Sequence, residues 1–210
     1  MPNIIDLTHS FHNDMPGVHI SPAKSLEKDG WNASTLELYS HAGTHMDAPY
    51  HFDVSDERID QMKVERFVGP AWVVRLDKVL PRQLISVEDL GDVADKVQAG
   101  DSLLLQSGWS QKQGTPQYRD ELPRISESLA RWCVDKQINM LGVEPPSVAD
   151  VNHLKEVTLI HQILLGGNVI IIEGLTKLDQ ISAPKVKLIA LPLKIKGGDG
   201  APARVIAIEE

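Results

Sequence analysis

Residues 41–51 read His41-Ala42-Gly43-Thr44-His45-Met46-Asp47-Ala48-Pro49-Tyr50-His51. This stretch holds three of the eight histidines of the chain, together with one aspartate. Neutral imidazole and carboxylate are ligands that zinc and its first-row neighbours take in proteins. The stretch therefore predicts a metal site, provided that the backbone brings these side chains together. A histidine-rich surface loop with satisfied hydrogen bonds is the alternative.

The residues before this stretch predict a strand. Polar and apolar side chains alternate over residues 35–41, which is typical of a half-buried strand. Leu36 and Leu38 would face the core, and His41 would face the other side. A helix would also place His41 and His45 on one face, but the glycine and proline of the stretch disfavour it.

The spacing of the candidate ligands requires a bend. At a rise of about 3.3 Å per residue, His41 and His45 would lie roughly 13 Å apart in a continuous strand. One ion cannot span that distance with metal–nitrogen bonds of about 2.0–2.1 Å. Gly43 lies between them and permits a turn. His45 and Asp47, about 6.6 Å apart on one face of a strand, need no turn.

The pattern H-x-G-T-H-x-D-x-P-x-H at residues 41–51 resembles the signature of the metal-dependent cyclase-like hydrolases. Bacterial kynurenine formamidases are the best-known members of this family, and isatin hydrolases form a second branch. The resemblance extends to the opening Ile5-Asp6-Leu7-Thr8 and to the closing Asp199-Gly200-Ala201-Pro202-Ala203-Arg204. It therefore covers nearly the full chain.

The resemblance implies five metal ligands and one catalytic residue. The implied ligands are His41, His45, Asp47, His161 and Glu173. The first three would hold one divalent ion, Asp47 would bridge to a second, and the last two would complete that second position. His51 would stay off the metal as the catalytic acid and base. Zinc and manganese both suit these nitrogen and oxygen ligands.

Taken without the resemblance, the two distant ligands have ordinary interpretations. His161 lies among apolar residues of a predicted helix, where a hydrogen-bonded core histidine is common. Glu173 follows an apolar strand, where a solvated turn carboxylate is common. In the isatin hydrolase branch a glutamine replaces this glutamate and one ion is held, so Glu173 favours two ions.

Hydrophobic periodicity predicts an α/β protein with a mixed sheet. Strands are expected at residues 71–76, 102–106, 140–143 and 169–172, and in a hairpin of residues 188–191 with 205–208. Helices are expected at residues 86–100, 126–137 and 151–165. The resemblance adds that the sheet is barrel-like with helices packed outside. We expect a single domain over residues 1–210.

Composition limits the partners and the location. A net charge of −8 and a pI of about 5.5 argue against nucleic acid or an anionic membrane as partner. Cys133 is the only cysteine, and no basic, apolar leader opens the chain, which fits the cytoplasm. The expected partner is a small-molecule substrate. The resemblance further implies a homodimer or homotetramer.

The expected activity is metal-dependent hydrolysis of a C–N bond other than a peptide bond, in an amide, formamide or lactam of an aryl substrate. A lyase, dehydratase or cyclase acting on a hydroxy-carbonyl substrate is one alternative, and a non-catalytic metal-binding protein is another. Ser107 lacks a G-x-S-x-G context and is expected in a pocket wall. Cys133, within a helical run, is expected to be structural.

The sequence does not assign the substrate-binding residues. The segment Gly142-Val143-Glu144-Pro145-Pro146-Ser147 departs from the family's aspartate-threonine-proline-serine, and His9, His12 and His19 are unassigned. Some aromatic residues could stack on an aryl ring or belong to the core. They are Phe11, Trp31, Tyr39, Phe52, Trp72 and Trp109.

Overall fold

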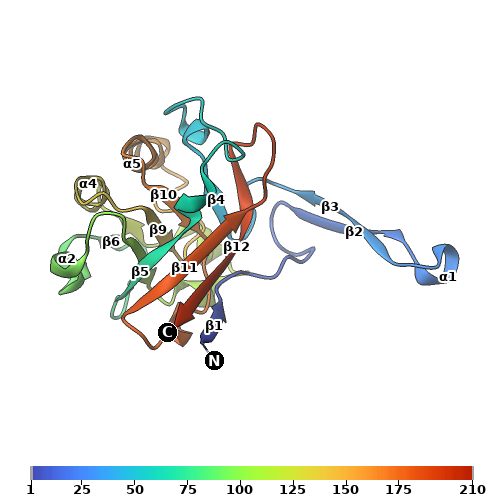
Figure 1. The fold of residues 1–210 in the computed structure, drawn as a ribbon, viewed down its shortest axis with the longest axis horizontal. Coiled ribbons are helices and arrows are strands. Elements are labelled where there is room, and N and C mark those ends of the chain that lie inside the picture. Colours follow the sequence, from blue (N-terminus) through green and yellow to red (C-terminus); the bar gives the residue numbers. More distant parts are fainter. Residues whose placement is uncertain (1, 210) are drawn as a thin grey trace.

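A mixed β-sheet that closes on itself organises the computed structural model, which describes residues 2–209 (Figure 1). Its strand order is β1-β12-β11-β5-β7-β9-β10-β4, and β12 also pairs with β4. This second pairing closes the sheet into a barrel of seven strands, with β1 added outside β12. The bounds are β1 (Asn3–Asp6), β4 (His45–Asp47), β5 (Val68–Arg75), β7 (Ser102–Gln106), β9 (Met140–Val143), β10 (Ile170–Glu173), β11 (Lys185–Pro192) and β12 (Gly200–Glu209).

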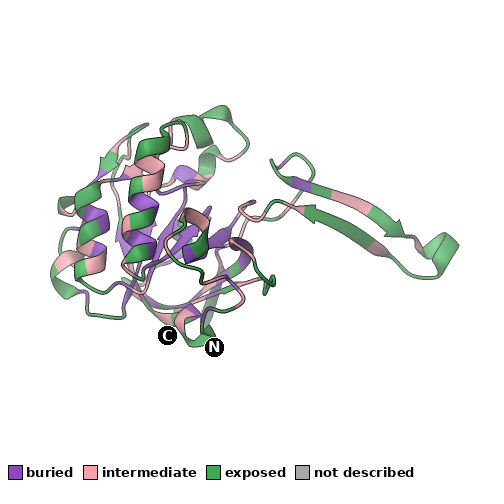
Figure 2. Ribbon diagram, turned by 90° about the horizontal axis from the view of Figure 1, so that it is seen from above, coloured by how far each residue is buried: buried purple, intermediate pink, exposed green. Residues whose placement is uncertain are grey.

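The four central strands β5, β7, β9 and β10 are parallel, and the other pairs of this sheet are antiparallel. Parallel strands need crossover connections, which here carry the helices α2 (Val93–Lys96), α4 (Glu127–Asp135) and α5 (Leu154–Gly166). Figure 2 shows α4 and α5 with buried residues on the side facing the sheet and exposed residues on the other. The predicted α/β class, with a barrel-like mixed sheet and helices outside, is confirmed.

Apolar residues on the two faces of the central strands fill two separate cores. In β7, Leu104 packs inside the barrel, whereas Leu103 and Leu105 pack against the outer helices. Ile171 of β10 likewise belongs to the outer core, and its two neighbours belong to the inner core. Burial on both faces explains why these strands read as continuous apolar runs. The strand prediction at 169–172 is confirmed, shifted by one residue.

The remaining elements are short and lie between the barrel strands in the sequence. They are β2 (Val18–Lys24), β3 (Ala33–Leu38), β6 (Leu84–Ile85), β8 (Arg124–Ile125), α1 (Leu26–Asp29), α3 (Pro116–Asp120) and the 3-10 turns η1 (Pro49–Phe52), η2 (Val64–Phe67), η3 (Glu88–Leu90), η4 (Trp109–Lys112) and η5 (Leu178–Gln180). No helix within residues 2–209 is long and apolar enough to cross a bilayer.

The strand predicted over residues 35–41 exists, but its predicted core face is wrong at Leu36; Leu38 is partly buried against a small cluster of Met15, Val18 and Ala42. β3 pairs with β2 in a hairpin arm, residues 18–38, that projects away from the barrel (Figures 1 and 2). Leu36 is 58% exposed there. Alternation with period two identifies the two faces of a strand, but it does not tell what covers either face. The strand ends at Leu38, so His41 belongs to the turn that follows.

Two helix predictions also need correction. Residues 86–100 form only η3 and α2, because Gly91 adopts a positive φ of 52° between them. Ser86 does not cap a helix; its N–H and hydroxyl both donate to Asp89. The helix expected from residue 151 begins at Leu154, where the His153 side chain accepts the N–H of Glu156 as the cap.

Candidate metal centre

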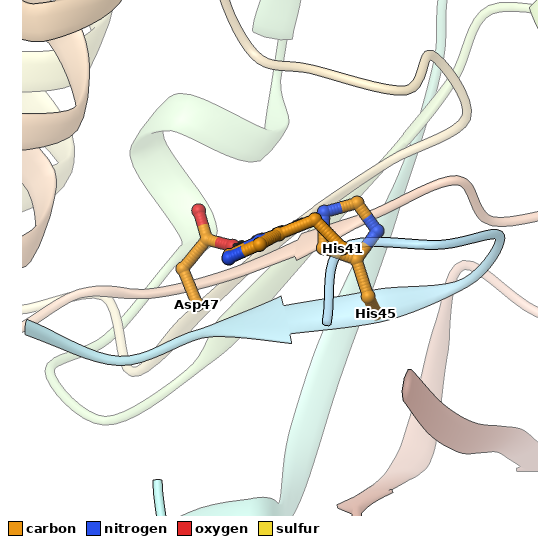
Figure 3. A group of neighbouring side chains, drawn as sticks. All are labelled: His41, His45 and Asp47. Carbon is orange, nitrogen blue, oxygen red and sulfur yellow. Dashed lines mark hydrogen bonds and ion pairs between the residues drawn. The ribbon is translucent and has the colours of Figure 1, made fainter. Parts of the chain in front are cut away.

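The turn at Gly43 brings the first three candidate ligands together. Gly43 has a φ of +59°, in the left-handed region, and a Cβ there would lie 2.6 Å from a ring carbon of Phe11. His41 therefore folds back beside β4, where its Nδ1 lies 2.9 Å from Oδ1 of Asp47. Figure 3 shows His41, His45 and Asp47 on one side of β4. The predicted bend at Gly43 is confirmed.

The barrel supplies the two distant candidates from β10 and α5. β10 pairs with β4 so that Glu173 lies opposite His45, and Oε2 of Glu173 is 3.1 Å from Nε2 of His45. His161 projects from α5, and its Nε2 is 3.3 Å from Oε1 of Glu173 and 3.6 Å from Oδ2 of Asp47. His45, Asp47, His161 and Glu173 are all buried. Residues far apart in sequence thus share one buried site.

Each of three histidines uses one ring nitrogen outside the centre and turns the other toward it. Nδ1 of His45 bonds the carbonyl of Gly43 at 2.9 Å, and Nδ1 of His161 bonds the carbonyl of Val157 at 2.7 Å. Nε2 of His41 contacts the carboxylate of Asp199 at 3.0 Å. An outer hydrogen bond of this kind fixes the orientation and tautomer of a metal-binding imidazole.

The centre fits a cation in its charge and in its unsatisfied atoms. Oδ2 of Asp47 is buried and has no hydrogen-bond partner among the described residues, which is costly for a carboxylate oxygen. Burial opposes protonation of His41, but its hydrogen bonds to Asp47 and Asp199 raise its pKa to about 9. Burial also opposes protonation of His161, but Glu173, Asp47 and the carbonyl of Val157 together raise its pKa. The surroundings therefore favour positive charge.

Three groups of candidate ligands form among residues 2–209, with ligand atoms within 4.8 Å of one another in each group. One contains His41, His45 and Asp47, and a second contains Asp47, His161 and Glu173. These two groups match the two ion positions that the resemblance implied, with Asp47 common to both. The third group joins His41 and His51 to Asp199.

His51 lies beside this cluster, on the 3-10 turn η1, which Pro49 begins. Its ring stacks on that of His41 at a centroid distance of 3.9 Å and meets the edge of Phe52 at 4.5 Å. Its side chain is 24% exposed, so solvent and substrate can reach it. Burial is the main reason why its pKa is lowered, although Asp47 opposes this, and the ring is therefore neutral at pH 7.

A pocket of about 1080 Å³ opens onto the cluster. Tyr39 and Phe52 line it, but Phe11, Trp31, Trp72 and Trp109 do not. His9 also lines it; burial lowers its pKa to about 4, and its Nε2 has no hydrogen-bond partner within the described chain. His12 lines the pocket as well, whereas His19 lies on the arm.

The segment that departs from the family pattern divides between the pocket and a neighbouring loop. Pro146 and Ser147 line the pocket. Glu144 is buried and accepts from the N–H of Ser107 at 2.7 Å and from its hydroxyl at 2.8 Å. Ser107 therefore holds Glu144 and is not in the pocket wall, contrary to our expectation. Cys133 is fully buried, and burial raises its pKa to about 12, in keeping with a structural thiol.

Sequence reasoning missed Asp199. Its carboxylate lies 3.0 Å from Nε2 of His41 and 3.5 Å from Nδ1 of His51. The sequence predicted a hairpin of residues 188–191 with 205–208, and it assigned no role to the residues between these two strands. The place of Asp199 in the closing stretch, which carries part of the resemblance, was the one signal that could have pointed to this aspartate.

Comparisons with known proteins agree on one family. The family model described as "Putative cyclase" matches residues 5–150. The chain is 30% identical over 210 residues to a kynurenine formamidase of Bacillus cereus (strain ATCC 10987 / NRS 248), covering 96% of this chain and 95% of that protein. It is similar in structure to isatin hydrolase A from Labrenzia aggregata, with a TM-score of 0.89, 25% identity, and 99% and 94% of the chains covered. A potential metal-dependent hydrolase with cyclase activity matches with a TM-score of 0.81, 27% identity, and 100% and 99% coverage.

Proposed function

Because the chain belongs to the putative cyclase family, we propose that it is a metal-dependent hydrolase that cleaves a C–N bond other than a peptide bond. The resemblance predicted from residues 41–51 is thereby confirmed. The observation that carries the proposal is the buried cluster of three histidines and two carboxylates beside a partly exposed fourth histidine. Relatives named kynurenine formamidase and isatin hydrolase support hydrolysis of an amide, formamide or lactam.

In this proposal the cluster binds divalent zinc or manganese at two positions. His41, His45 and Asp47 would hold one ion, and Asp47, His161 and Glu173 would hold the other. When bound, such an ion would supply hydroxide at neutral pH and polarise the substrate carbonyl. The orphaned Oδ2 of Asp47 supports this arrangement, because a second cation would satisfy it.

His51 is the catalytic acid and base. Its ring is neutral at pH 7, so it can accept a proton from water. The protonated ring can then donate to the leaving nitrogen of the amide, which is a poor leaving group without a proton. Stacking on His41 and the edge contact with Phe52 hold the ring at the mouth of the centre.

The lining of the pocket supports the proposal of an aryl substrate. Tyr39 and Phe52 offer aromatic surface, and Met15 and Val157 add apolar lining. The free Nε2 of His9 can bond a polar substituent. A volume of about 1080 Å³ leaves room for a bicyclic lactam or an aryl formamide with a side chain. We favour an arylformamidase of the kynurenine formamidase kind.

A hydrolysis panel tests this proposal. Purified protein loaded with zinc or with manganese is assayed on N-formylkynurenine, isatin and simple aryl formamides, and release of formate or of a new carboxylate is measured. His51→Ala is expected to keep its metal and to lose turnover by a factor of about 10²–10⁴, as for removal of a general acid–base group. Loss of metal from His51→Ala would contradict the role of His51.

The same panel separates the alternatives. Dehydration of a hydroxy-carbonyl substrate without amide hydrolysis would indicate a lyase, dehydratase or cyclase. Tight metal binding without any turnover would indicate a non-catalytic metal-binding protein. The proposal also includes a cytoplasmic homodimer or homotetramer that binds a small molecule and no nucleic acid. Light scattering coupled to size-exclusion chromatography tests the oligomeric state.

A further inference from the structure

Asp199 connects two histidines that the proposed function places in different roles. Its Oδ2 lies 3.0 Å from Nε2 of His41 and 3.5 Å from Nδ1 of His51. The two rings are themselves stacked at a centroid distance of 3.9 Å. One carboxylate oxygen therefore faces a candidate metal ligand and the candidate acid and base together.

The barrel fixes Asp199 at this point. β12 begins at the next residue, and its register places Gly200 opposite Asp47 of β4. The carbonyl of Asp199 accepts the N–H of Ala48 at 2.9 Å. A Cβ at residue 200 would lie 2.7 Å from Cε1 of His41, so a glycine is needed for that ring to lie against the strand. Backbone contacts thus fix the position of this residue, and its carboxylate faces the two histidines.

The two nitrogens of His41 have separate partners. Nδ1 faces Asp47 inside the cluster, and Nε2 faces Asp199 outside it. If Nδ1 of His41 binds a metal ion, Nε2 carries the ring proton and donates a hydrogen bond to the carboxylate of Asp199. A carboxylate that accepts from a metal-binding imidazole orients the ring and increases its basicity.

We propose that Asp199 is a positioning residue that orients His41 toward the metal and His51 toward the substrate. This inference rests on the proposed function. A direct ligand role in the third group of candidates is the competing assignment. Positioning is favoured because Oδ2 of Asp199 forms a hydrogen bond with His41 at 3.0 Å and lies 3.5 Å from His51. The side chain of Asp199 is also 37% exposed, whereas four of the five candidate ligands (His45, Asp47, His161 and Glu173) are buried.

The test compares Asp199→Ala and Asp199→Asn with a control at a residue that contacts the same loop. Asp60→Ala is the control, since Oδ1 of Asp60 accepts the N–H of Gly197 at 2.9 Å and, among the described residues, forms no hydrogen bond or ion pair with either histidine. Zinc affinity is measured by competition with a chromophoric chelator, and zinc content at saturation by elemental analysis. The values of kcat and KM are measured at saturating zinc.

Asp199→Ala is expected to weaken zinc binding by about 10–100-fold, with unchanged zinc content at saturation. At saturating zinc, kcat should still be reduced and KM should change little. Asp199→Asn keeps one acceptor oxygen and should recover part of both losses. The zinc affinity and kcat of Asp60→Ala should stay within about twofold of the wild-type values, because most surface substitutions have small effects.

Other outcomes overturn the assignment. Loss of one whole ion at saturation would make Asp199 a ligand. Equal effects in Asp60→Ala would make the loop, and not the carboxylate, responsible. A normal kcat of Asp199→Ala at saturating zinc would show that Asp199 does not orient His51. If the wild type binds zinc but hydrolyses nothing, the proposed function fails, while the affinity comparison still decides the role toward His41.

Discussion

Asp47 is the single residue on which both candidate ion positions depend. Its Oδ1 is 2.9 Å from His41, and its Oδ2 is 3.6 Å from His161. We expect Asp47→Ala to empty both positions, because removing a bridging carboxylate takes one ligand and one charge from each. Elemental analysis of the purified variant, saturated with zinc or manganese and desalted, measures this.

Asp47→Asn serves as the second variant, since it keeps the shape of the side chain in the core and removes only the charge. The exposed Asp56→Ala controls for a general effect of net charge. Retention of one full ion in both Asp47 variants would show that Asp47 is not a bridge.

Gly43 carries the bend on which the rest of the centre depends. Gly43→Ala should destabilise the fold by roughly 1–2 kcal/mol from the left-handed backbone alone, measured by urea unfolding. It should also weaken metal binding, because the new Cβ would press on Phe11 between the two flanking histidines. Gly30→Ala is the matched control: its φ is +79°, but nothing lies within 4 Å of the new Cβ. Unchanged metal affinity in Gly43→Ala would contradict this coupling.

At the scale of residues, the sequence predicted what lies close along the chain. The bend at Gly43 follows from chain geometry, and the places of His161 and Glu173 came from the resemblance. The contact of Asp199 with His41 could not be predicted in this way. It depends on the register of β12 against β4, more than 150 residues apart, and local periodicity carries no information about such a pairing.

At the scale of elements, Glu209 ties the end of β12 to the turn before β11. Its Oε1 accepts from the N–H of Ala183, and from the N–H and hydroxyl of Ser182, at 2.6–2.9 Å. The N–H of Ala183 is the largest of the contacts that lower the pKa of Glu209 to about 2. A lowered carboxyl pKa contributes stability above its ordinary value of 4.5, and this stability is lost as the pH falls through about 2.

Glu209→Gln should therefore be less stable than the wild type at pH 7, and the difference should shrink as the pH falls from 5 to 2. Urea unfolding at several pH values measures it. Ser182→Ala removes one of the donors and should show the same trend more weakly. A difference that stays constant over this range would rule out the charge of Glu209 as its cause.

Elements buried on both faces were the most predictable. The apolar runs that became β7, β9 and β10 have no polar face, and only the middle of a sheet explains this. The arm of β2 and β3 has the alternation of a half-buried strand, yet little of it is buried. The same alternation occurs in strands that pack on a core and in strands that do not. The position of the arm outside the barrel could therefore not be predicted from residues 35–41 alone.

At the scale of the whole molecule, the centre exists only when the barrel is closed. Its residues come from the turn before β4, from β4, η1, α5 and β10, and from the residue before β12, and β4 joins the sheet by pairing with both β10 and β12. An unfolded chain separates these groups, so ions that bind the centre bind the folded state and stabilise it. Metal binding and closure of the barrel are therefore thermodynamically linked.

This linkage predicts the effect of metal on thermal unfolding. Zinc or manganese at about 100 times its dissociation constant should stabilise the fold by about 2.7 kcal/mol for each position that it fills. For a domain of this size that raises Tm by about 5–10 °C for each filled position. Calorimetry of chelator-treated protein, before and after adding back the ion, measures the shift. His51→Ala should show the same shift, because His51 lies off the metal, whereas Asp47→Asn should lose it. A shift that persists in Asp47→Asn would place the ion outside the cluster, since that variant removes the carboxylate that both ligand groups share.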